Sequence, residues 1–98
     1  MVEHLVWFKL RTDAPQAAKE QLLAELVALK DRIPGIIDAS AGADFSGRAA
    51  GYTHGFVVRF VDRAALEAYH PHPAHRAVVE RYVEPISEGV LALDFEHG

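Results

Sequence analysis

The segment YHPHPAHRAVVERY, residues 69–82, holds three of the six histidines of the chain, at His70, His72 and His75. A neutral imidazole is a good general base at physiological pH. A tyrosine hydroxyl can donate a hydrogen bond to a developing enolate oxygen, and Tyr69 begins the segment. An aldol-type ring closure requires these two roles and no cofactor. The segment therefore predicts acid/base chemistry on a small molecule, with His75 as the base and Tyr69 as the donor.

Two further histidines lie in stretches of alternating hydrophobic pattern. His4 shares one face of residues 2–10 with Val6, and His54 shares one face of residues 52–61 with Phe56. Such alternation predicts strands with one buried face. Because His75 lies on the apolar stripe of a predicted helix, we expect these side chains to point into the layer between sheet and helices. We predict a small pocket there, with His4 and His54 as substrate-binding residues.

The same residues have a structural interpretation. An inward histidine often bonds a main-chain carbonyl within the core. His72 precedes Pro73 and can cap a helix, and we expect His70 on the surface. A non-catalytic, stress-related dimer with core histidines therefore stays an alternative to the enzyme.

Metal binding is a further alternative. His72 and His75 are three residues apart, and imidazoles are zinc ligands. However, Pro73 breaks the helical register between them, and no carboxylate or cysteine is close in sequence. We predict no metal ligand and no cofactor.

Hydrophobic periodicity predicts the elements that position these residues. A first strand at 2–10 precedes an amphipathic helix that Thr12 or Asp13 could cap, with Pro15 in its first turn and Pro34-Gly35 at its end. Strands are predicted at 36–45, 52–61 and 90–96, with a loop at 46–51. Between the last two strands, we expect a short helix capped by Asp62 and a second helix from Pro73 to Gly89.

The predicted order, β-α-β-β-α-β, indicates an α+β, ferredoxin-like protomer forming a single domain over residues 1–98. Right-handed crossovers give it a four-stranded antiparallel sheet with helices on one face. The uncovered face would carry Leu5, Trp7, Val57 and Val61. Because large exposed apolar patches mark interfaces, we predict a homodimer through this face.

Composition narrows the functional classes. A net charge of −4 over 98 residues, without a run of basic residues, argues against nucleic acid as a partner. No apolar stretch approaches the roughly 18 residues of a membrane span, so no membrane partner is expected. Charges at Glu3 and Lys9 argue against a signal peptide, and the chain has no cysteine. We expect a cytoplasmic protein.

The stretches EHLVWFKL, GADFSGRAAGYTHGFVVRFVDRAALEAY, HPAH and LALDFE together resemble the stress-responsive dimeric α/β-barrel family, over nearly the whole chain. The resemblance implies a ferredoxin-like protomer whose sheet packs against a second copy. The family includes a cofactor-free polyketide cyclase. Its functional histidines and tyrosine lie in motifs that correspond here to His4, His54, Tyr69 and His75. His70-Pro71 replaces an apolar pair of the family pattern.

Overall fold

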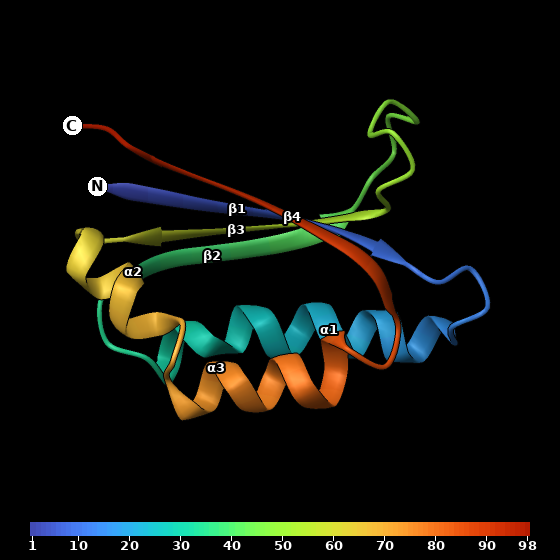
Figure 1. Ribbon diagram of the computed structural model, residues 1–98, viewed down its shortest axis with the longest axis horizontal. Coiled ribbons are helices and arrows are strands. Elements are labelled where there is room, and N and C mark those ends of the chain that lie inside the picture. Colours follow the sequence, from blue (N-terminus) through green and yellow to red (C-terminus); the bar gives the residue numbers. More distant parts are fainter.

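The computed structural model describes residues 1–98 as one antiparallel sheet with helices on a single face (Figure 1). The strands are β1 (Val2–Leu10), β2 (Ile36–Ala43), β3 (His54–Phe60) and β4 (Ser87–Glu96). The helices are α1 (Gln16–Ala28), α2 (Arg63–Tyr69) and α3 (Pro73–Val78), with the short helical turns η1 (Leu29–Asp31) and η2 (Val79–Val83). This order confirms the predicted α+β, ferredoxin-like fold.

The sheet has the strand order β2-β3-β1-β4, so β1 lies in its interior and β4 at one edge. All three pairings are antiparallel, and His4 lies opposite Val58 on β3 and Asp94 on β4. The even-numbered residues of β1 face the helices. Val6 and Phe8 are buried there against Leu22 and Leu26 of α1. The predicted division of β1 into a covered and an uncovered face is therefore confirmed.

Several predicted boundaries are wrong by a few residues. β2 ends at Ala43 because Asp44 begins a turn, where its carboxylate accepts hydrogen bonds from Ser46 Oγ (2.7 Å) and Gly47 N (3.1 Å). β3 begins at His54 rather than at residue 52.

The last helical region and the last strand also differ from the prediction. η2 is a π-helical turn that closes the helical region at Val83. Gly89, predicted to stop a helix, instead lies within β4 opposite Lys9. Gly89 is therefore a strand residue rather than a helix terminator.

The predicted cap of the first helix is also wrong. Pro15 occupies the N-cap position of α1 and no side chain caps it. The carboxylate of Asp13 instead accepts a hydrogen bond from Arg11 at 2.9 Å. Asp13 is thus paired with Arg11 and makes no hydrogen bond to the start of α1.

Two caps position the segment that carries the candidate residues. Asp62 Oδ1 accepts a hydrogen bond from Ala65 N at 2.9 Å and begins α2, as predicted. His72 Nδ1 accepts one from Ala74 N at 3.0 Å and begins α3, which is the structural role considered for it. These caps fix the bend between α2 and α3 and direct Tyr69 toward the sheet.

The other face of the sheet carries no helix (Figure 1). Trp7 and Val57 are exposed there by 47% and 38%, while Leu5 is half-buried; Val61, which is 51% exposed, follows the end of β3. Strand β4 adds three exposed apolar side chains to this face, at Leu91, Leu93 and Phe95. The loop between β2 and β3 projects from the same side of the sheet (Figure 1). None of the helices combines the length and apolarity that crossing a membrane requires.

Candidate functional site

Four rings gather where the end of α2 meets β1. The centroids of Tyr69 and His75 are 4.3 Å apart, and those of His4 and Tyr69 are 6.0 Å apart. His70 joins them, with its ring 5.3 Å from that of His4 and 5.9 Å from that of His75. The structure thus places three of the four predicted site residues together: His4, Tyr69 and His75. The strand that carries His4 is far in sequence from the two helices that carry the others.

His75 has one ring nitrogen engaged and one free. Its Nδ1 lies 2.9 Å from the main-chain carbonyl oxygen of His70. Because a carbonyl only accepts, Nδ1 carries the proton, and Nε2 keeps the lone pair that a base requires. Burial lowers the pKa of His75, although the bond to the His70 carbonyl acts in the opposite direction. The ring is therefore neutral near pH 7.

Tyr69 is buried, and its hydroxyl is unpaired. The side chain is only 1% exposed and packs against Phe60, with ring centroids 5.0 Å apart. The hydroxyl has no hydrogen-bond partner within the chain, and its contact with solvent is limited to the small exposed area of this side chain. Burial raises the pKa of Tyr69 well above its usual range, which keeps the hydroxyl protonated. This group is available to donate a hydrogen bond to a ligand.

Asp94 is a member of the cluster that sequence reasoning missed. Its Oδ1 contacts Nδ1 of the buried His4 across the β1–β4 pair, while its own side chain is 42% exposed. Asp94 shares the helix-facing side of β4 with Val90 and Ala92. The available signal was a carboxylate that follows the apolar Val90 and Ala92 on that side. It could be interpreted only once the register placing Asp94 opposite His4 was known.

His70 is exposed, as predicted, but it is not isolated. Burial of its ring lowers the pKa of His70, the nearby His4 adds to this, and Asp94 acts in the opposite direction. The prediction that His70 lies on the surface is therefore confirmed, but it did not include the contacts of its ring with His4 and His75.

His54 lies apart from this cluster. It is opposite Phe8, four residues along β3 from the Val58 that faces His4, which corresponds to about 13 Å. Its Nδ1 is 2.7 Å from Thr53 Oγ1, and burial, followed by the charge of Lys19, lowers its pKa. His4 and His54 therefore lie at two separate positions on the helix-facing side of the sheet.

Two hollows of the molecule lie away from the ring cluster. One of about 590 Å³ lies on the uncovered face under the β2–β3 loop, and its lining includes Trp7, Tyr52 and His54. The other, of about 510 Å³, lies beside α1. Neither is lined by Tyr69 or His75, so the cluster meets solvent at the surface rather than in either hollow.

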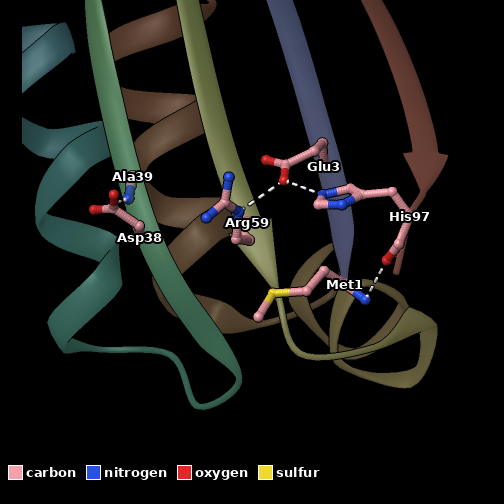
Figure 2. A network of polar contacts seen from close by, with 6 residues as sticks. All are labelled: Met1, Glu3, Asp38, Ala39, Arg59 and His97. Carbon is pink, nitrogen blue, oxygen red and sulfur yellow. Dashed lines mark hydrogen bonds and ion pairs between the residues drawn. The ribbon is translucent and has the colours of Figure 1, made fainter.

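A second polar cluster lies on the uncovered face (Figure 2). Glu3 is 7% exposed, and its Oε2 accepts hydrogen bonds from Arg59 Nε at 2.7 Å and His97 Nε2 at 2.6 Å. Led by the bond from His97, these contacts hold the pKa of Glu3 below its usual value. The carboxylate is thus ionised and paired within an otherwise apolar surface.

Comparisons with known proteins agree on the family. Olivetolic acid cyclase of Cannabis sativa is 33% identical over 76 residues, covering 76% of this chain and 75% of the cyclase. A stress-response A/B barrel domain-containing protein of Arabidopsis thaliana is 27% identical over 95 residues, covering 97% of this chain. The chain spans about a third (36%) of the length of that Arabidopsis protein.

Solved structures share the fold over nearly the whole chain. A dimeric ferredoxin-like protein from Jannaschia sp. CCS1 has a TM-score of 0.80 at 29% identity and covers 98% of both chains. A hydroxynitrile lyase from Passiflora edulis has a TM-score of 0.87 at 21% identity, over 99% of this chain and 93% of the lyase. The family model for the stress responsive A/B barrel domain matches residues 2–97. The chain therefore belongs to the stress-responsive A/B barrel domain family.

Proposed function

We propose that this protein is a homodimeric, small-molecule-binding enzyme that closes a ring by an aldol-type condensation without a cofactor. His75 is the base and Tyr69 the hydrogen-bond donor. His4 and His54 bind oxygens of the substrate. The observation that carries the proposal is the pairing of two free groups: the Tyr69 hydroxyl lacks a partner in the chain, and its ring lies 4.3 Å from an imidazole whose tautomer leaves Nε2 unprotonated.

The reaction follows from these two groups. A CH₂ between two carbonyls is acidic enough for Nε2 of His75 to remove a proton. The enolate carbon then attacks a ketone carbon of the same molecule, which forms the ring bond and an alkoxide. Tyr69 donates a hydrogen bond to the oxygen that becomes negative, and the imidazolium of His75 returns the proton to it. Positioned acid/base catalysis of this kind contributes about 10²- to 10⁴-fold in rate.

The substrate class is supported by the relative of 33% identity, whose name is that of a cyclase. A linear β-polyketone is the substrate type that this relationship favours.

The homodimer is proposed to form through the uncovered sheet face. Trp7 and Val57 of the expected interface are exposed there, and Leu91, Leu93 and Phe95 extend the patch across β4. A contiguous apolar surface of this kind is uncommon on a monomer. The dimeric relatives of the same fold support self-association.

A non-catalytic dimer is the second candidate function. The observation in its favour is that neither of the two hollows described above is lined by Tyr69 or His75. In this case the ring cluster would only complete the packing between α2 and β1.

A cyclisation assay separates the two candidates. Purified protein is incubated with linear tri- and tetra-β-ketone thioesters, and ring products are resolved from spontaneous lactones by mass spectrometry. The enzyme proposal expects a carbocyclic product that disappears in His75→Ala and falls strongly in Tyr69→Phe. The control variant is His97→Gln, whose histidine lies on the opposite face of the sheet. Product formed equally by wild type and both site variants would refute the assignment.

A further inference from the structure

We propose that His4, His70 and Asp94 form a binding site for a divalent transition-metal ion of the zinc type. Each residue offers one donor atom, a ring nitrogen or a carboxylate oxygen, and the three donors lie within 4.8 Å of one another. The set shares His4 with the proposed substrate-binding residues but uses neither Tyr69 nor His75, so metal binding does not require the acid/base pair.

The donor set selects the class of ion. Two imidazoles and one carboxylate are ligands that zinc binds in proteins, and three protein ligands leave a fourth tetrahedral position for water or another molecule. Calcium and magnesium prefer oxygen donors throughout, so this set disfavours them.

The geometry requires a small contraction. Metal–donor bonds of 2.0–2.2 Å place tetrahedral donors about 3.4 Å apart. A spread of 4.8 Å must therefore close by about 1.4 Å at its widest side. His4 is 5% exposed on the central strand β1 and is the fixed member. His70 and the half-exposed Asp94 side chain have the freedom to supply the movement and also give the ion a path from solvent.

Two features organise the site in advance. The contact between His4 and Asp94 across β1 and β4 holds two of the three ligand side chains next to each other, and coordination through the same two atoms would replace this contact. The third, His70, stands at the C-cap of α2, and its main-chain carbonyl accepts the hydrogen bond from His75. The backbone that carries His70 is therefore held while its side chain stays free to turn.

His72 and His75, whose three-residue spacing is compatible with a metal site, are not part of this set. In the structure, His72 uses its Nδ1 to cap α3, and His75 uses its Nδ1 to bond the His70 carbonyl. Neither is one of the three proposed ligands. Two of those ligands, His4 and Asp94, are 90 positions apart in sequence and are brought together by the pairing of β4 with β1. The site is thus a product of the fold rather than of a local motif.

The test uses tag-free protein stripped with EDTA and exchanged into chelator-free buffer. Zn²⁺ is titrated by calorimetry, and Co²⁺ is titrated by its visible absorption, which reports a tetrahedral site. We expect one ion per chain, with affinity reduced at least about a hundredfold in His70→Gln and in Asp94→Asn, because even outer-shell substitutions cost 10- to 100-fold. The His70 side chain is exposed, so His70→Gln is expected to fold.

The matched control is His97→Gln, which removes another histidine paired with a carboxylate, Glu3, on the opposite face. Its affinity for Zn²⁺ should equal that of the wild type. Three results would each overturn the proposal: no binding by the wild type at 100 equivalents of Zn²⁺, unchanged affinity in His70→Gln, or loss of the ion in His97→Gln. Because no substrate is present, failure of this test is distinguishable from failure of the proposed enzyme activity.

Discussion

The Nδ1 atom of His75 is 2.9 Å from the main-chain carbonyl oxygen of His70, and this hydrogen bond fixes the tautomer of the imidazole next to Tyr69. A local feature of the chain, the bend at His70–His72, therefore determines which nitrogen of His75 is available for chemistry. The same bend places the His70 side chain beside His4. One turn between two short helices thus serves both the acid/base pair and the proposed metal site.

Replacing His75 should separate its chemical role from its structural one. His75→Gln keeps an N–H that can bond the His70 carbonyl but has no basic nitrogen. We expect turnover of a β-polyketone to fall by about 100-fold or more, the usual contribution of a general base. The melting temperature should stay close to that of the wild type in His75→Gln and fall in His75→Ala. Full turnover in His75→Gln would exclude His75 as the base.

Turnover should fall on the acid side at a pH below the ordinary pKa of a histidine. A base works only when unprotonated, so activity is lost as the pH falls through the pKa of His75. Burial, with smaller contributions from the neighbouring His70, His4 and Arg76, lowers that pKa below its ordinary value of 6.5. We therefore expect kcat/KM to be constant from pH 7 to 8 and to decline only below pH 6.5, measured with EDTA present. An acid limb centred above pH 7 would contradict this assignment.

The sequence predicted the fold well because its signals are local. Alternation along 2–10 identified both the strand and its buried face, and Asp62 identified the start of α2. The predictions that failed depend on side-chain contacts in turns, such as that of Asp44 with Ser46, or on strand pairing. Gly89 indicates a helix end by its type, but it pairs with Lys9 because β4 extends along the whole of β1.

The candidate site was predictable in part for the same reason. Side-chain direction placed His4, Tyr69 and His75 in the layer between sheet and helices, and there they meet. The distance of His54 from them and the arrival of Asp94 depend on strand register, which hydrophobic pattern alone does not supply. The contacts of His70 depend on the direction of the bend between α2 and α3. Pro71 and Pro73 indicate that the chain bends there, but they do not indicate in which direction.

Gly35 should be the least replaceable of the glycines with positive φ. Its φ is +90°, and a Cβ at this position would lie 2.6 Å from the Cβ of Ala65 in α2. Gly35→Ala therefore combines left-handed strain, about 1–2 kcal/mol, with an overpacking cost of about 1–3 kcal/mol. Gly47 also has positive φ, +67°, but open space around it, so Gly47→Ala should show the strain alone. Urea unfolding of both variants tests this, and equal losses would show that the contact with Ala65 relaxes without cost.

Glu3 should make the protein sensitive to acid. Hydrogen bonds from His97 and Arg59 lower its pKa in the folded state relative to the unfolded state. The resulting stabilisation is complete above the unfolded value, near 4.5, and is lost as the pH falls through the lower folded value. Wild type should thus exceed Glu3→Gln in stability at pH 7, and the gap should narrow below about pH 4.5.

Chemical unfolding at pH 7, 5 and 3, at one protein concentration, measures this gap. Glu67→Gln on the exposed side of α2 is the control, and its difference from wild type should stay small throughout. A gap between wild type and Glu3→Gln that is constant from pH 7 to 3 would show that the carboxylate is not stabilised by its partners.

The dimer face can be tested with two adjacent residues of β4. Leu91 and Val90 are 50% and 49% exposed, but Leu91 lies opposite Trp7 on the uncovered face and Val90 lies opposite Phe8 on the helix side. A charge at Leu91 would be desolvated by a partner sheet, whereas one at Val90 would stay in water. We therefore expect Leu91→Arg to sediment as a monomer, and Val90→Arg to match the wild-type dimer. Both variants share strand, exposure and introduced charge, so they differ only in the face they present. Dimerisation retained in Leu91→Arg, or lost equally in both, would place the interface elsewhere.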